Sequence, residues 1–326
     1  MSAATTIDSW LRRRLVCPRD HGTLTDEGTM LVCAAGHRYP CVEGIPVMVL
    51  DDVRQTHWIA AHSLEEPEAD ISGNGNNIID PYVRDAVGAT CGNFYGAEFS
   101  RTMTQYPIPR LPIAARHTDE LLLDVGCNWG RWTFAAARAG FLVVGIDPSL
   151  IGIRAARRVA AQLGLRANFI VADARYLPFT AGTFETVFSY SVLQHFAPED
   201  VVTSAREMRR VLVDGGRVAV QMAAMFGLRS LVQLARRKFT RAREFQVRYW
   251  PPTKVRRAFD RAVGPARLEA DSYFSLNAQA ADLPLLAPKH RMIVRLSDRL
   301  RRTSAYIPWL VSLADSVYVH ATSSRE

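Results

Sequence analysis

The chain has 326 residues and combines 48% hydrophobic with 22% charged residues, a balance that excludes an intrinsically disordered protein. This length predicts two domains, or one large domain with an appendage. The net charge of +8 would suit a polyanionic partner, but only three of the 40 basic residues are lysines, and such arginine bias is typical of genomic base composition. The sequence has no long uncharged apolar run, no secretory signal pattern at its start and an odd number of cysteines, so we expect a cytoplasmic protein without disulfides.

Three regions follow one another along the chain. Residues 1–50 alternate short β-type runs with turns and predict a small β-rich module. Residues 51–115 predict a linker that is polar at first and proline-rich at 106–112. Within it, residues 81–106 are expected either to close over a cofactor or to cover the main sheet as a helix, and their candidate contacts are Tyr82, Asn93, Phe94 and Tyr95. Residues 116–326 hold the main domain, with a basic insert at 226–252 and a helical insert at 276–312.

Buried strands alternate with helices from Leu121 onward. Apolar runs predict strands at 121–125, 142–146, 167–171, 186–190 and 217–222, and helices at 131–139, 150–163 and 199–212. Uninterrupted apolar strands joined by helices indicate parallel pairing, with both faces of the sheet covered. We therefore expect an α/β fold with a doubly wound, mostly parallel sheet.

A glycine-rich turn from Asp124 to Gly130 joins the first of these strands to its helix. Ligands of open α/β sheets bind at the carboxyl ends of the strands, where glycines let backbone approach and a helix N-terminus offers N–H groups to an anion. The spacing differs from a dinucleotide-binding fingerprint, because Asn128 stands between Gly126 and Gly130. Asparagine tolerates left-handed backbone geometry, so the turn itself is preserved.

Two further acids follow later strands. Asp147 ends the second strand, at the separation from Asp124 where a carboxylate can accept hydrogen bonds from both ribose hydroxyls. Asp173 and Ala174 follow the third strand, where the edge of an adenine would lie. Either acid could instead cap a helix or close a turn.

Five motifs in this order resemble those of class I S-adenosylmethionine-dependent methyltransferases of the UbiE-like kind. They are LDVGCNWG, VGIDPS, ADARYLPF, FSYSVLQHF and EMRRVL followed by Gly-Gly, and together they cover about residues 120–222. The resemblance implies S-adenosylmethionine as cofactor and a seven-stranded Rossmann-like sheet, completed by antiparallel strands at 267–275 and 316–322. It also implies the cofactor-binding residues, which are Asp124, Gly126, Cys127, Asn128, Gly130, Asp147, Pro148, Asp173, Ala174, Tyr190 and Ser191. The sequence departs from the family at Asn128 and Asp214, both at tolerant turn positions.

Catalysis in such an enzyme depends mainly on in-line positioning and exclusion of water, because the sulfonium already makes the methyl group electrophilic. An oxygen or carbon nucleophile can also need a general base. His195 follows the fourth strand and is the candidate base, with Tyr190 nearby as a second candidate catalytic residue. The alternative is that His195 and Gln194 only shape the loop before the next helix.

The basic residues are concentrated between Phe226 and Arg261, where eleven lysines and arginines face two acids. Residues 228–238 predict an amphipathic helix above the active site. Such a segment could recognise RNA, a phosphorylated glycan carrier or a membrane surface. The alternative is an arginine-rich face that is simply solvated.

The first 50 residues are too few to bury a stable core alone, and a metal often compensates in such modules. Cys17 precedes His21 by four residues, as Cys33 precedes His37, and the four side chains would form a tetrahedral zinc set. With Tyr-Pro at 39–40 and Gly-Ile-Pro at 44–46, the module resembles a Trm112-like zinc ribbon. That family has cysteines at the positions of Asp20 and Gly36, so the alternative is a degenerate copy without metal.

We expect an S-adenosylmethionine-dependent methyltransferase that acts on oxygen or carbon of a small molecule such as a sugar, lipid, quinone or natural product. One alternative is an RNA methyltransferase that docks through the ribbon and the basic insert. Another is a non-catalytic partner that activates a second protein. A nicotinamide-dependent dehydrogenase conflicts with the spacing of the glycine loop.

Overall fold

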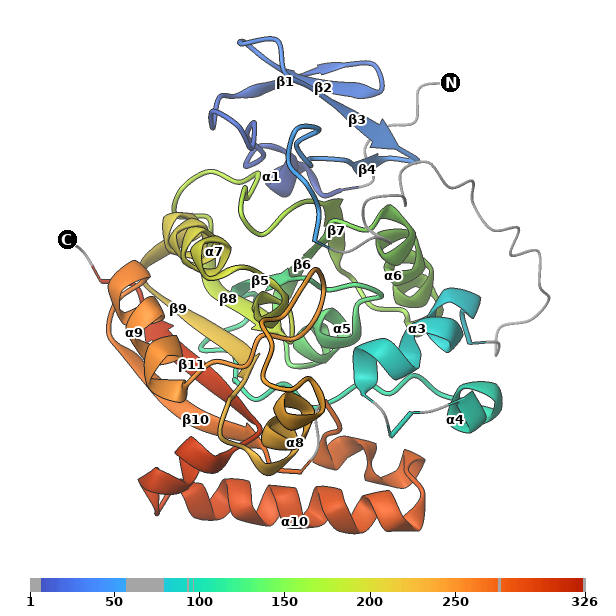
Figure 1. Cartoon of the computed structure of the whole chain (residues 1–326). Coiled ribbons are helices and arrows are strands. Elements are labelled where there is room, and N and C mark those ends of the chain that lie inside the picture. The colour runs from blue at the N-terminus through green and yellow to red at the C-terminus, as the bar shows by residue number, and fades with distance from the viewer. Residues whose placement is uncertain (1–6, 57–78, 93, 96, 275–276, 325–326) are drawn as a thin grey trace.

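The computed structural model describes residues 7–56, 79–92, 94–95, 97–274 and 277–324. It shows an α/β domain with a small antiparallel sheet docked on one side (Figure 1). The α/β fold and the separate β-rich module confirm the predicted fold class.

The small sheet belongs to the N-terminal module and has the strand order β1-β2-β3-β4. The elements of the module are α1 (Ser9–Arg12), β1 (Leu24–Glu27), β2 (Met30–Cys33), β3 (Arg38–Val42) and β4 (Ile45–Pro46). The chain after β4 runs alongside an edge strand of the main sheet, where Val47 pairs in parallel with Val171 and the Met48 N–H donates to the Val171 carbonyl at 2.7 Å. The module therefore covers part of an otherwise open sheet edge.

The main sheet has seven strands in the order β10-β11-β9-β8-β5-β6-β7. Its strands are β5 (Leu121–Val125), β6 (Leu142–Asp147), β7 (Asn168–Val171), β8 (Phe184–Tyr190), β9 (Leu212–Ala223), β10 (Ala266–Ser272) and β11 (Ser316–Thr322). Strands β5 to β9 pair in parallel, whereas β11 is antiparallel to both β9 and β10. The predicted seven-stranded sheet and its closing antiparallel pair are confirmed.

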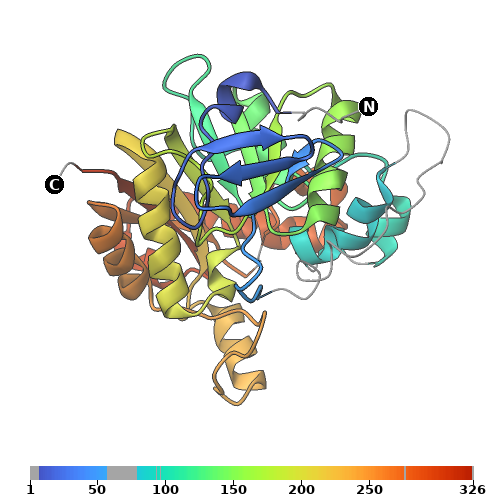
Figure 2. The same cartoon turned by 90° about the horizontal axis from the view of Figure 1, so that it is seen from above.

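Helices cover both faces of this sheet and gather around the carboxyl ends of its strands (Figures 1 and 2). Their bounds are α3 (Pro81–Cys91), α4 (Ala97–Thr102), α5 (Arg131–Arg138), α6 (Leu150–Leu163), η1 (Leu193–His195), α7 (Pro198–Val211), α8 (Leu228–Arg236), α9 (Pro252–Ala262), η2 (Ala280–Leu285), α10 (Pro288–Ser304) and η3 (Pro308–Leu313). None of the described helices is both long and apolar enough to cross a bilayer.

Local sequence signals explain the element boundaries. Helix α6 begins where the Ser149 side chain accepts a hydrogen bond from the Gly152 N–H, and it ends at Gly164 in the left-handed conformation. Leu122, Leu123 and Val125 of β5 are fully buried, as the uninterrupted apolar run predicts for a central parallel strand. The sheet thus forms a rigid platform for whatever lies at its carboxyl edge.

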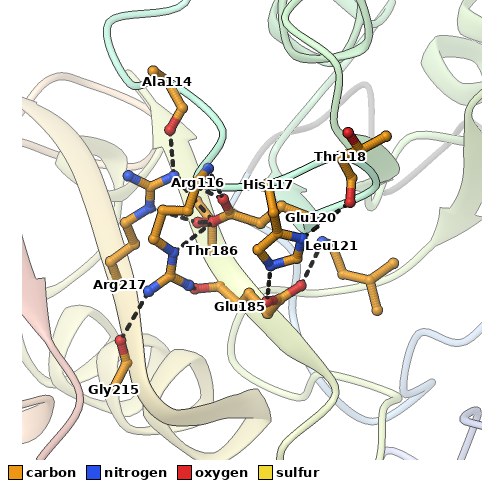
Figure 3. Close-up of polar contacts among 10 residues, drawn as sticks. All are labelled: Ala114, Arg116, His117, Thr118, Glu120, Leu121, Glu185, Thr186, Gly215 and Arg217. Carbon is orange, nitrogen blue, oxygen red and sulfur yellow. Dashed lines mark hydrogen bonds and ion pairs between the residues drawn. The ribbon is translucent and has the colours of Figure 1, made fainter.

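A buried carboxylate cross-links the edge of the sheet at which the parallel strands begin, opposite their carboxyl ends (Figure 3). Glu120 is fully buried, accepts hydrogen bonds from the Arg116 N–H and the Thr186 hydroxyl, and pairs with Arg217 at 3.0 Å. Burial alone would raise the pKa of Glu120, but these hydrogen bonds and the two arginines hold it below its usual value. The cluster joins the linker to β8 and β9, far from the carboxyl edge.

Candidate functional site

The glycine loop after β5 has the tight geometry that the sequence predicts. Gly126, Asn128 and Gly130 all have left-handed backbones, with φ of 79°, 46° and 90°. The N–H groups of Gly126 and Cys127 donate to the Ile146 carbonyl at 2.8 and 2.9 Å, which ties the loop to β6. The Cys127 side chain is buried, so the loop can offer a ligand its backbone rather than its thiol.

Close packing explains why the first glycine is needed. A Cβ atom on Gly126 would lie 2.3 Å from Val192 Cγ2, which is closer than real Cβ atoms approach other atoms. Val192 belongs to the segment between β8 and η1, so this segment lies directly against the glycine loop. The two connections together form the floor of the candidate site at the carboxyl edge.

Asp147 lies at the end of β6, beside the glycine loop. One carboxylate oxygen accepts from the Asn128 N–H at 3.0 Å and the other accepts from the Ser149 N–H at 2.9 Å. Its side chain remains partly exposed, and desolvation raises its pKa to about 6. Each oxygen keeps a lone pair, so an ionised Asp147 can accept two more hydrogen bonds from a ligand.

Asp124 lies beneath the loop rather than at its surface. It is buried and accepts a hydrogen bond from the Thr133 hydroxyl of α5 at 2.6 Å. Its pKa is raised to about 7, mainly by burial and in part by the nearby Asp147, while the hydrogen bond from Thr133 acts in the opposite direction. This geometry fixes β5 to the start of α5 and thereby shapes the glycine loop.

Asp173 follows β7 as predicted, but its carboxylate is already paired. Arg175 donates to it at 2.7 Å, and Gln55 from the segment after the N-terminal module donates at 3.0 Å. The neighbouring Ala174 is buried in the core. The segment after the module therefore reaches the position at which the sequence predicts the adenine to lie.

Tyr190 ends β8 inside a buried polar network that the sequence analysis missed. Its hydroxyl donates to Asp271 at 3.0 Å and accepts from the Gln279 amide at 2.9 Å. Asp271 also accepts from Ser316 at 2.7 Å and from Gln221 at 3.1 Å. Burial raises the pKa of both Tyr190 and Asp271. The network joins the ends of β8, β9, β10 and β11, and only the tertiary fold brings these residues together.

A buried ion pair lies directly after the glycine loop and connects it to η2. Arg131, the first residue of α5, lies 2.8 Å from Asp282 of η2, and both side chains are almost fully buried. Arg131 also donates to the carbonyls of Pro107 and Asn277 at 2.9 and 3.0 Å. It thus fastens the linker and the helical insert against the loop. Its place after Gly130 was visible in the sequence, but its burial was not.

His195 lies in η1, immediately after the segment that packs on Gly126. Its ring stacks on Phe245 with a centroid distance of 3.9 Å, and its Nδ1 lies 2.6 Å from the Phe245 carbonyl. A carbonyl only accepts, so Nδ1 carries the hydrogen and Nε2 is the basic nitrogen of the neutral ring. Ser191, with φ of 64°, accepts a hydrogen bond from the Gln194 amide at 2.7 Å.

The segment predicted to close over the cofactor is partly helical. Tyr82 at the start of α3 accepts a hydrogen bond from the Asn128 side chain at 2.9 Å, so this segment does reach the glycine loop. Tyr95 is buried, and Phe94 stacks on His290 of α10. Asn93 lies outside the described residues.

In the N-terminal module, four side chains form a cluster that could hold a metal ion. Cys17, Asp20, Cys33 and His37 place their ligand atoms within 4.8 Å of one another. His37 Nδ1 lies 3.4 Å from Cys17 Sγ, 3.3 Å from Cys33 Sγ and 3.1 Å from Asp20 Oδ2. A tetrahedral zinc ion, with bonds of about 2.3 Å to sulfur and about 2.0 Å to nitrogen, separates such ligand atoms by about 3.5 Å. The donor set and its spacing therefore fit zinc.

The cluster differs from the predicted ligand set at one position, where Asp20 replaces His21. The His21 N–H donates to the Cys17 carbonyl at 2.8 Å, and its backbone is left-handed with φ of 56°. This turn directs the His21 ring toward α7, where its Nε2 lies 3.9 Å from Glu207. Asp20 occupies the position of a cysteine in the Trm112-like pattern, which was the signal that could have identified it.

Comparisons with known proteins agree with this geometry. Residues 122–216 match a family model described as a methyltransferase domain. Methyltransferase GfsG of Streptomyces halstedii is 35% identical over 127 residues, which cover 38% of this chain and 44% of that protein. A ubiquinone biosynthesis O-methyltransferase of Brucella anthropi is 37% identical over 97 residues, covering 29% and 39%. A tRNA U34 carboxymethyltransferase of Alcanivorax borkumensis is 38% identical over 112 residues, covering 32% and 33%.

The fold and the glycine loop define a Rossmann-like domain with a candidate ligand site at the carboxyl edge of the sheet. Together with the family match, they identify residues 122–216 as a methyltransferase domain. The chain spans less than half the length of each of the three curated relatives.

Proposed function

We propose that this protein is an S-adenosylmethionine-dependent methyltransferase that acts on an oxygen atom of a small-molecule acceptor. The arrangement of Asp147 beside the glycine loop carries the proposal. Its carboxylate is held by the Asn128 and Ser149 N–H groups at the end of β6, with a lone pair left on each oxygen for the hydroxyls of a ribose.

Several residues of the chain would hold the cofactor, and S-adenosylmethionine would supply an electrophilic methyl group. The backbone of Gly126, Cys127, Asn128 and Gly130 would contact its methionine portion, with Asp124 supporting the loop from below. Pro148, Ala174, Tyr190 and Ser191 complete the proposed cofactor-binding set. Asp173 would contribute to the adenine position only alongside its existing bonds to Arg175 and Gln55.

His195 would be the general base for an oxygen nucleophile. Its Nδ1 points its hydrogen at the Phe245 carbonyl, so its Nε2 can take a proton from an acceptor hydroxyl. Arg248 donates to the His195 carbonyl and holds η1 in place from the basic insert. Tyr190 is more deeply buried and would orient the acceptor or the cofactor through its hydroxyl rather than remove a proton.

The Brucella anthropi relative is an O-methyltransferase, which supports oxygen as the methylated atom here.

The N-terminal module would bind one zinc ion through Cys17, Asp20, Cys33 and His37. Zinc at this position would be structural, since all four ligands come from the protein and no coordination position is left open. Its binding energy would hold together a module too small to fold on its own core.

A methyl-transfer assay tests the proposed function. The protein is incubated with S-adenosylmethionine that carries a labelled methyl group and with fractionated polar and lipid extracts, and the label in each fraction is counted. We expect transfer to a small-molecule fraction with the native protein and none with Asp147→Ala. Label in RNA alone, or no binding of S-adenosylmethionine at all, would contradict the proposal.

A further inference from the structure

Helix α8 projects from the body of the protein at the site end of the molecule (Figure 2). It attaches through one face, where Ser230 and Leu234 are buried and the Ser230 N–H donates to Asp315 at 2.8 Å. The chain that follows the helix returns to the site, where the Arg248 N–H donates to the Gln194 carbonyl at 2.8 Å. The projection is thus anchored at both ends beside His195.

The opposite face of α8 carries an apolar stripe that faces solvent. Leu228, Leu231, Val232 and Ala235 recur at helical spacing, and Leu228 is 61% exposed. Phe239, just beyond the helix, is 69% exposed. An ordinary amphipathic helix buries such a stripe, so a contiguous apolar face left in water marks an interaction surface.

Basic side chains lie on α8 and in the chain that follows it. Arg229 and Arg236 belong to α8, and Lys238, Arg241 and Arg243 follow it. Glu244 is the one acid between residues 226 and 250. In this stretch these five cations face a single acid. The combination of uncompensated positive charge and exposed aliphatic groups defines what we name the α8 surface.

Two exposed aromatic residues lie in the segment before Asp315, the residue that binds the start of α8. Asp315 lies two residues after η3. Trp309 of η3 is 63% exposed, and Tyr306, just before η3, is 88% exposed. Trp and Tyr are the residues that favour the boundary between lipid and water.

We propose that the α8 surface docks this protein on an anionic lipid bilayer, with the aliphatic stripe inserted among the head groups and the cations on lipid phosphates. The occupant follows from the chemistry of the surface. Nucleic acid would pair with the cations but gives leucine and valine nothing to bury, because stacking on bases uses aromatic rings. A second copy of the chain would cover the stripe but would bring two sets of like charges together. An anionic bilayer satisfies both parts.

Vesicle flotation tests the docking directly. The full chain is mixed with phosphatidylcholine vesicles that either contain or lack phosphatidylglycerol, at low and at high salt, and the floated protein is measured. We expect binding only with phosphatidylglycerol, weakened by salt. Replacing Leu228, Leu231 and Val232 with serine should weaken binding at least about tenfold. Replacing Arg236, Lys238 and Arg241 with glutamine should weaken it by about fivefold per cation.

Leu142→Ser is the matched control. Leu142 is also exposed, but it lies at the start of β6, at the amino ends of the strands and away from α8. It should bind vesicles like the native protein, and thermal unfolding should show that all variants are folded. Equal binding by the triple serine variant, or binding to vesicles without phosphatidylglycerol, would overturn the proposal. The proposal would also be overturned if the native protein formed a dimer and the triple serine variant did not. It would be overturned as well if neither protein floated with vesicles and the triple serine variant still bound RNA. None of these readouts depends on the proposed methyl transfer.

Discussion

Gly126→Ala is the substitution whose cost can be worked most directly from the structure. Gly126 has a φ of 79°, and an alanine in this left-handed region costs about 1–2 kcal/mol. Its new Cβ would also lie 2.3 Å from one Val192 methyl and 2.9 Å from the other, and overpacking of this kind costs about 1–3 kcal/mol. The two costs together predict that the free energy of unfolding falls by about 2–5 kcal/mol, which lowers Tm by about 3–8 °C for a chain of this length.

Gly140→Ala separates the two contributions. Gly140 has a φ of 89°, but a Cβ there would meet nothing within 4 Å. Gly140→Ala should therefore lower Tm by only about 2–3 °C, which is the cost of the left-handed backbone alone. Adding Val192→Ala to Gly126→Ala should recover the steric part of the loss. Thermal unfolding of the native protein, of the Gly126→Ala and Val192→Ala variants and of the double variant measures this as a double-mutant cycle. Equal losses for Gly126→Ala and Gly140→Ala, with no recovery in the double variant, would refute the packing of Val192 on the glycine loop.

Three further predictions concern the cofactor, the metal and the base. S-adenosylmethionine should bind more weakly as the pH falls through about 6, because Asp147 accepts hydrogen bonds from ribose hydroxyls best when it is ionised, above its raised pKa. The Asp147→Asn variant should bind it weakly at every pH, and calorimetry measures both affinities. Purified protein should hold about one zinc ion per chain, and Asp20→Ala should weaken zinc retention against a chelator whereas His21→Ala should not. His195→Gln should lower kcat by about 10²–10⁴-fold while the cofactor affinity stays unchanged.

Each of these has a result that would count against it. Cofactor affinity that is flat across pH 5–8 in the native protein would remove Asp147 from the ribose position. Zinc lost from His21→Ala but kept by Asp20→Ala would restore the ligand set predicted from the sequence. Turnover by His195→Gln equal to that of the native protein would leave His195 as a loop residue.

The sequence predicted the main sheet well because its strands and helices carry strong local signals. The uninterrupted apolar run at Leu121–Val125 and the capped helix at Leu150–Leu163 appear in the structure with the predicted bounds. The glycine loop and Asp147 could be placed from chain order alone, since both follow strands whose carboxyl ends must meet at one edge.

Residues brought together by tertiary packing could not be predicted in this way. Asp271 and Gln279 meet Tyr190 from β10 and from the chain after it, and no local pattern marks them. The exchange of His21 for Asp20 depends on a left-handed backbone at His21, which residue spacing does not reveal. Likewise, the amphipathic pattern of α8 predicted a helix but could not show that its apolar stripe faces solvent.

Calorimetric titration of the native protein and of Asp147→Ala with S-adenosylhomocysteine, the demethylated product, tests the central claim most directly. The account predicts one binding site per chain in the native protein. It also predicts a loss of at least about 3 kcal/mol in Asp147→Ala, because two charge-assisted hydrogen bonds to the ribose disappear. Absence of binding to the native protein, or equal affinity in the two proteins, would contradict the cofactor site and the methyltransferase activity proposed from it.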